Sequence, residues 1–147
     1  MTIAVDFDGT IVTHEYPKIG KERTFATDTL KHLIKDGHRL VLWTVREGDL
    51  LDEAVNWCRE RGVEFYAINR DYPEEERENN NHFSRKLKVD LWIDDRNIGG
   101  IPEWGTIYRM INENLTWNDI INENSRLDYD YNYHDAKPKS KKWWMFW

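Results

Sequence analysis

The sequence predicts an α/β protein: a three-layer, Rossmann-like domain built on a mainly parallel sheet of about five strands. Two observations support this fold class. Short apolar runs typical of buried strands alternate along the chain with segments whose apolar residues recur every three or four positions. Such alternation favours right-handed crossovers and a parallel sheet covered on both faces. Polar residues also follow each long strand directly, so the carboxyl edge of the sheet is the expected ligand-binding edge.

The first ten residues contain the first strand and the turn around which the rest of the chain is organised. Ile3, Ala4 and Val5 form a continuous apolar run, as in a strand buried on both faces. The run changes abruptly into Asp6-Phe7-Asp8-Gly9-Thr10, which is either an ordinary turn or the start of a site, since Asp and Gly are common in turns. Residues 11–20 are expected to form a turn and a short flap.

The remaining elements follow from apolar spacing and from capping residues. Leu30, Leu33 and Ile34 have helical spacing, with Thr27 as the expected cap and Gly37 as the end of the helix. Residues 71–84 have no apolar face and are expected to form a solvated connection. The other expected elements are strands at 39–43, 63–68 and 89–93, a helix from Asp49 to near Gly62, a short fifth strand at 106–108 and a helix at 116–121.

The domain organisation predicted from 147 residues is one main domain over residues 1–125 and a tail over residues 126–147 that is rich in Tyr, Lys and Trp. The segments after Asp8 and before Lys86 are too short for an inserted domain. The last five residues, 143–147, are all large and apolar. The tail is either mobile or docks on its own domain, on a second copy of the chain or on a partner.

Composition excludes several classes of protein. No apolar run reaches the roughly 20 residues of a membrane span, and no signal peptide precedes the first strand, so we expect a cytoplasmic protein. All 27 acidic residues, but only 17 of the 21 basic ones, lie in residues 1–135, which therefore carry a net charge of −10. This charge argues against non-specific nucleic-acid binding. The single cysteine, Cys58, excludes a disulfide framework, and its apolar neighbours indicate a core thiol.

Polar residues at four strand ends predict a site at one edge of the sheet. They are Asp6, Thr44, Asn69 and Asp94. Asp8 and Asp95 add two further carboxylates, and so many acids at one edge cannot all stay ionised without a cation. Oxygen ligands without a histidine cluster suit a hard metal, and we expect Mg²⁺. A magnesium site beside a nucleophile, a hydroxyl and a lysine is equipped for phosphoryl transfer.

These residues resemble the four ordered motifs of the haloacid dehalogenase (HAD) superfamily. The motifs are Asp6-Phe7-Asp8-Gly9-Thr10, Thr44, a lysine before the fourth strand and Asp94-Asp95, and they cover residues 1 to about 95. Arg96-Asn97 and residues 99–102 resemble small stand-alone bacterial members. The resemblance implies a Mg²⁺-dependent phosphomonoester hydrolase, a phosphatase that acts through an aspartyl-phosphate. Asp8 at the second position is similar to the phosphatase and mutase branch.

The resemblance also implies a role for each residue. Asp6 would be the nucleophile and a metal ligand, and Asp8 the acid and base, with its backbone carbonyl on the metal. Thr44 and neighbouring backbone groups would hold the phosphoryl oxygens. Gly9, Thr10 and Val45 would be further substrate-binding positions. Asp94 and Asp95 would bind the metal, one directly and one through water, in an order that the sequence does not fix. The spacing in the family favours Lys86 over Lys88 as the phosphate-binding lysine.

Other residues near the expected site have two readings. Arg46, Asn69 and Arg70 could reach a second group of the substrate, although arginines are more often plain surface residues. His14 and His82 lie in loops near the mouth, where solvent exposure is the commoner state. HAD enzymes commonly carry an inserted cap domain, for which this chain has no room, so the resemblance implies a domain with no inserted cap and an open site. Such a site admits a bulky phosphorylated partner or a nucleic-acid end. Two alternative functions stay open at this point: a phosphotransferase, and a metal-binding or regulatory module with little or no turnover.

Overall fold

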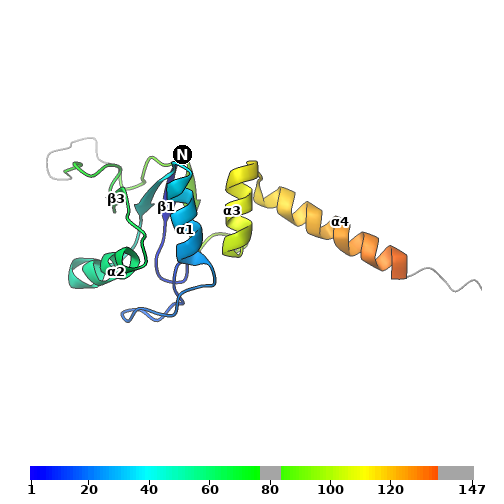
Figure 1. The fold of residues 1–147 in the computed structure, drawn as a ribbon, viewed down its shortest axis with the longest axis horizontal. Coiled ribbons are helices and arrows are strands. Elements are labelled where there is room, and N and C mark those ends of the chain that lie inside the picture. Colours follow the sequence, from blue (N-terminus) through cyan, green and yellow to red (C-terminus); the bar gives the residue numbers. More distant parts are fainter. Residues whose placement is uncertain (77–83, 136–147) are drawn as a thin grey trace, which may run out of the picture. The chain divides into compact units, whose positions relative to one another are not determined.

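The computed structural model describes residues 1–76 and 84–135 and confirms an α/β protein (Figure 1). Its sheet has four strands in the order β3-β2-β1-β4, and every neighbouring pair is parallel. The strands are β1 (Thr2–Val5), β2 (Arg39–Leu42), β3 (Ala67–Ile68) and β4 (Leu91–Ile93). The third and fourth strands are shorter than the sequence predicts.

Strand β1 lies at the centre of the sheet because its side chains are apolar on both faces. Ile3, Ala4 and Val5 are at most 1% exposed. Ile3 is paired with Leu40 of β2 on one side and with Leu91 of β4 on the other. The backbone N–H of Asp6 then donates to the Ile93 carbonyl at 3.0 Å. Asp6 therefore leaves the sheet between the carboxyl ends of two neighbouring strands.

Four helices complete the described fold: α1 (Ala26–Lys35), α2 (Gly48–Glu60), α3 (Trp104–Glu113) and α4 (Trp117–Asp135). Helix α1 packs on β2 and buries Leu30 and Leu33, as their spacing predicts. The predicted N-caps are wrong. Thr27 lies inside α1 and donates its backbone N–H to the Glu22 carboxylate at 3.0 Å, and Asp49 lies in the first turn of α2. The observed N-caps, Phe25 and Glu47, each lie two residues before the predicted ones, whereas Gly37 and Gly62 follow the helix ends as predicted.

The predicted fifth strand is also wrong. Residues 106–108 lie in α3, whose buried residues are Trp104 and Ile107. Their separation of three positions is helical spacing, which the β-branched residues Thr106 and Ile107 conceal in a short window. The helix expected over residues 116–121 continues to Asp135 in α4.

The chain divides into two compact units, the first being Met1–Tyr108 and the second beginning at Arg109. The first unit contains the whole sheet with α1 and α2. The predicted boundary after residue 125 falls inside α4. No helix among residues 1–76 and 84–135 has the length and apolar character to cross a membrane. The tail from residue 136 and His82 lie outside the described residues, so the predictions for them stay predictions.

The thiol of Cys58 is buried in α2, which confirms the prediction of a core cysteine. Burial raises the pKa of this thiol to about 12. A thiolate is the reactive form of cysteine, so the Cys58 side chain is a packing group at neutral pH.

Candidate functional site

The carboxyl ends of the strands meet around a small cavity, as predicted. Asp6 follows β1, Asp94 follows β4 and Thr44 comes two residues after the end of β2. The cavity has a volume of about 190 Å³ and is lined by Asp6, Asp8, His14, Trp43, Thr44, Val45, Asp94 and Arg96. Three short strands thus bring together five of the predicted site residues that are separate in the sequence.

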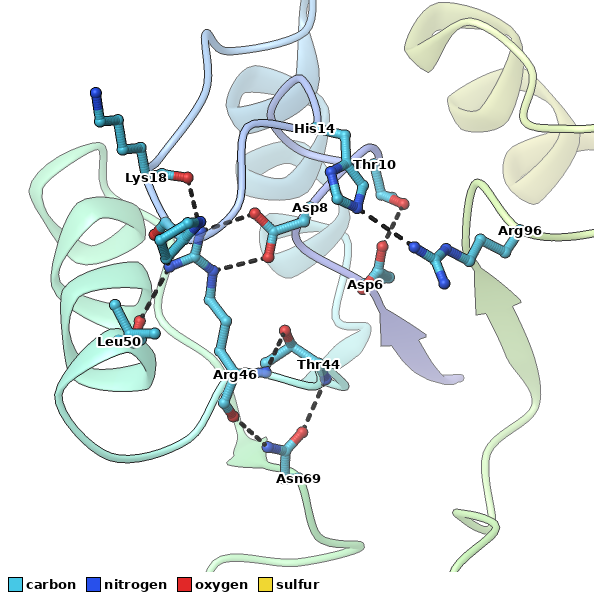
Figure 2. A network of polar contacts seen from close by, with 11 residues as sticks. Asp6, Asp8, Thr10, His14, Lys18, Thr44, Arg46, Leu50, Asn69 and Arg96 are labelled. Atoms are coloured by element: carbon cyan, nitrogen blue, oxygen red, sulfur yellow. Dashed lines mark hydrogen bonds and ion pairs between the residues drawn. The ribbon is translucent and has the colours of Figure 1, made fainter.

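The hydroxyl of Thr10 ties the first aspartate to the last. Thr10 Oγ1 donates to Asp6 Oδ2 at 2.8 Å (Figure 2). It also accepts from the Asp95 backbone N–H at 3.0 Å. The Thr10 carbonyl in turn accepts from the indole N–H of buried Trp104 at 3.0 Å. Thr10 therefore positions the carboxylates, whereas the sequence predicted that Thr10 binds the substrate.

Three carboxylates form a cluster that could hold a cation. One oxygen each of Asp6, Asp94 and Asp95 lies within 4.8 Å of the others. Burial, followed by the charges of Asp94 and Asp95, raises the pKa of Asp6 to about 7, against the lowering effect of the Thr10 hydrogen bond. Without a compensating positive charge, Asp6 therefore holds its proton to near neutral pH.

Gly9 makes room for this cluster. Its φ of +86° lies in the left-handed region, and a Cβ added to it would lie 2.3 Å from Asp95 Oδ2. Only glycine fits both the turn and the close approach of the carboxylate. The glycine after the second aspartate is thus explained by the position of Asp95.

Thr44 is held by Asn69 at the neighbouring strand end. The Thr44 backbone N–H donates to Asn69 Oδ1 at 2.8 Å, and Thr44 Oγ1 accepts the Arg46 backbone N–H at 3.2 Å (Figure 2). Two of the backbone N–H groups expected to bind a phosphoryl oxygen are therefore used inside the protein. Asn69 does not line the small cavity. Its side chain supports the Thr44 loop, whereas the sequence predicted a contact between Asn69 and the substrate.

Arg46 differs most from its predicted role. Its side chain is 0% exposed, and its Nε and Nη2 donate to the two carboxylate oxygens of Asp8 at 2.7 and 2.8 Å (Figure 2). Its remaining N–H groups donate to the carbonyls of Pro17, Lys18 and Leu50 at 2.9–3.4 Å. All five guanidinium donors are used, so this arrangement leaves none for the predicted contact of Arg46 with substrate.

The lysine predicted for the site does not reach it. Lys86 and Lys88 are both exposed, and neither lines the small cavity. The backbone N–H of Lys88 donates to Asp71 Oδ1 at 2.6 Å. Arg70 is also exposed and donates over 3.3–3.4 Å to the carbonyls of Pro73 and Glu75. Asp6, Asp8, Thr44 and Asp94 are therefore brought together without Lys86, Lys88 or Arg70 beside them, and Arg46 is the expected basic residue that does lie there, paired with Asp8.

Sequence reasoning assigned no role to Arg96 and Trp43, which line the cavity. Arg96 Nη2 lies 3.3 Å from Nε2 of His14, and the Arg96 backbone N–H donates to Asp94 Oδ1 at 2.9 Å. The signal that could have found Arg96 is its position directly after Asp94-Asp95. Trp43 immediately precedes Thr44, but its apolar character led us to assign it to the strand.

Comparisons with known proteins identify a relative but no activity. No protein-family model matches the sequence, and a search of curated proteins gives no match. A solved structure from Bacteroides thetaiotaomicron, described as that of a conserved protein, is similar to this chain. The two sequences are 67% identical, and the match covers 82% of this chain and 96% of the Bacteroides chain with a TM-score of 0.77. This chain belongs to the family of that Bacteroides protein. The description of the Bacteroides relative states no function, so the chemistry must be argued from the side chains.

Proposed function

We propose that the protein is a Mg²⁺-dependent phosphomonoester hydrolase with a HAD-like fold that acts through an aspartyl-phosphate on Asp6. The observation that carries the proposal is the place of Asp6 in the carboxylate cluster, in one small cavity with Asp8 and Thr44. The Asp-x-Asp-Gly-Thr sequence and the parallel strand order support the same reading. The Bacteroides relative neither supports nor opposes it.

The donor set fits a hard divalent cation. Asp6, Asp94 and Asp95 offer only oxygen atoms, and burial together with the charges of Asp94 and Asp95 raises the pKa of Asp6. These three residues would hold Mg²⁺, with the backbone carbonyl of Asp8 as an expected fourth ligand. When bound, Mg²⁺ supplies positive charge that keeps Asp6 ionised and attracts the phosphoryl oxygens.

The residues of this chain then perform two displacements. In the first, a carboxylate oxygen of Asp6 forms a bond to phosphorus while the ester P–O bond breaks, and Asp8 donates a proton to the leaving oxygen. In the second, Asp8 takes a proton from a water molecule that attacks the phosphorus and releases Asp6. Thr44 Oγ1 accepts the Arg46 backbone N–H, which leaves its hydroxyl proton for a phosphoryl oxygen.

Asp8 must change its partner in this scheme. Its carboxylate is directed at the Arg46 guanidinium (Figure 2) and must turn from there toward the leaving group. A carboxylate held by two charge-assisted hydrogen bonds is a poor proton donor. The described arrangement is therefore a resting state of the proposed enzyme.

A second candidate is a metal-binding module without useful turnover. The exposed position of Lys86, outside the cavity, favours it, because phosphoryl transfer benefits from a cation on the transferred group. Such a module would bind Mg²⁺ through the same aspartates. The two candidates differ only in turnover.

Phosphate release separates these candidates. Wild type and Asp6→Asn are assayed with and without Mg²⁺ on a panel of nucleotides, sugar phosphates and phosphorylated nucleic-acid ends. The phosphatase reading predicts Mg²⁺-dependent release that Asp6→Asn abolishes. Lys86→Ala and Lys88→Ala, assayed as a matched pair, test whether either lysine contributes to turnover, since both lie outside the cavity. Equal inactivity of wild type and Asp6→Asn, with Mg²⁺ binding intact in the wild type, would favour the module.

A further inference from the structure

A second and larger cavity adjoins the acidic one. Its volume is about 710 Å³, and its lining extends along the edge strand β3 and the start of α2. The two cavities share Trp43, Thr44 and Val45 in their walls. Val45 is 86% exposed, so it stands at the rim where the two cavities meet. None of the proposed chemical steps uses this second cavity.

Three aromatic residues line the larger cavity, Trp43, Phe65 and Tyr66. Neighbouring residues already hold two of these rings. The Arg39 guanidinium lies 4.9 Å from the centre of the Tyr66 ring, and Trp92 packs edge-on against Trp43 at a centroid distance of 5.9 Å. Aromatic walls fixed before a ligand arrives reduce the ordering cost of binding.

The charges in the lining do not suit a second phosphate group held deep in the cavity. The guanidinium of Arg46 is used by Asp8 and by three carbonyls, so only the backbone of Arg46 is available to the cavity. Arg70 contributes positive charge and Glu47 negative charge. The three aromatic residues of the lining offer flat apolar surface, and a planar ring is a group that such surface binds well.

The volumes of the two cavities suit two different parts of a substrate. A volume of 190 Å³ accommodates a phosphoryl group beside a cation, whereas 710 Å³ is in the range of pockets for whole small ligands. The carbon skeleton of a bound ester must leave the acidic cavity on some side. Residues 43–45 belong to the walls of both cavities, so the aromatic cavity is a neighbouring space for that skeleton.

We propose that the aromatic cavity binds the leaving group of the substrate and that this group carries a planar aromatic or heteroaromatic ring, as a nucleoside does. That the ring belongs to the leaving group rests on the proposed function, whereas the binding of the ring does not. It gives the open site a source of specificity that the carboxylate cluster cannot supply.

A matched pair of ligands tests the proposal. Adenosine 5′-monophosphate and ribose 5-phosphate both present a phosphate on the same primary carbon, and only the first carries a base. Because base stacking on aromatic side chains is worth about tenfold or more in affinity, kcat/KM for the nucleotide should exceed that for the sugar phosphate by about tenfold. Titration calorimetry of the Mg²⁺-loaded protein should give the same ratio of Kd values.

Variants assign the preference to the cavity. Phe65→Ala should bring the nucleotide-to-sugar ratio close to one, and Tyr66→Ala, at a more exposed position, gives a second test if Phe65→Ala unfolds. Tyr72→Ala is the matched control, because Tyr72 is an exposed aromatic residue that does not line the cavity. It should leave the ratio unchanged.

The outcomes separate this inference from the proposed function. Turnover of both esters with equal kcat/KM and equal Kd would overturn the aromatic subsite and leave the phosphatase standing. A preference that survives both Phe65→Ala and Tyr66→Ala would overturn it too. Preferential binding of the nucleotide without any turnover would support the subsite and contradict the phosphatase.

Discussion

The buried pair of Arg46 and Asp8 should be a strong and measurable coupling. The two side chains are 0% and 6% exposed, and two hydrogen bonds of 2.7 and 2.8 Å join them. Removing one member of such a pair leaves an uncompensated buried charge, which costs about 3–5 kcal/mol. We therefore expect Arg46→Met and Asp8→Asn each to lower the free energy of unfolding by several kcal/mol, about 3 or more for Arg46→Met.

A double-mutant cycle isolates the pair. If the second substitution removes the charge that the first left unpaired, the double variant loses less than the sum, and the coupling energy should be about 2–3 kcal/mol. Urea unfolding in Mg²⁺-free buffer measures each variant, and an unchanged m-value shows that the same transition is compared. Arg46→Lys, which keeps the charge and loses the two-pronged contact, should fall between wild type and Arg46→Met.

An exposed pair in the same chain provides the control. Arg109 and Glu123 are joined by two hydrogen bonds of 2.8 Å, but their side chains are 43% and 44% exposed. Water and salt weaken such a pair, so the coupling between Arg109 and Glu123 should be clearly smaller. A coupling for Arg46 and Asp8 that is no larger than this control would refute the reasoning from burial.

Three further predictions concern the carboxylate cluster and the core. Because the pKa of Asp6 is about 7 in the folded protein and 3.8 as its ordinary value, the folded state binds more protons between these values, and stability should fall as pH rises from 3.8 to about 7. Wild type should show this slope without metal, Asp6→Asn should show less of it, and Mg²⁺ should raise the Tm more at pH 8 than at pH 5. Gly9→Ala should lower the free energy of unfolding in urea by about 1–3 kcal/mol and weaken Mg²⁺ binding. Gly105→Ala is the control, because its Cβ would meet no atom within 4 Å, and it should be neutral or slightly stabilising. Equal effects of the two substitutions would contradict the role given to Asp95. Cys58 should react with a thiol reagent only after unfolding, and fast labelling of the native protein would show that its burial is misjudged.

The sequence was sufficient to predict the central sheet and the acidic edge. A run such as Ile3 to Val5 is apolar at every position, and the polar residue after it marks the strand end. Because parallel strands end at the same edge, Asp6, Thr44 and Asp94 could be placed together without coordinates. The prediction failed at residues 106–108, where two β-branched residues in a helix resemble a short strand.

The partners of the site residues could not be predicted in the same way. Nothing in the sequence around Arg46 shows that its guanidinium is buried, because its five acceptors come from Asp8, from residues 17 and 18 and from residue 50. The same holds for Asn69, whose side chain holds Thr44 from a different strand. Such contacts depend on how loops fold back over the sheet edge, and no local periodicity encodes that.

The most direct test of the account is to trap a phosphoryl group on Asp6. The Mg²⁺-loaded protein is mixed with the best substrate found in the panel, quenched in acid within one turnover and digested for mass spectrometry. If Asp6 is the nucleophile, the peptide that contains Asp6 carries a phosphoryl group, present with Mg²⁺ and absent in Asp6→Asn. Phosphate release by the wild type that proceeds without any such adduct, and that persists in Asp6→Asn, would contradict the assignment of Asp6 as the nucleophile.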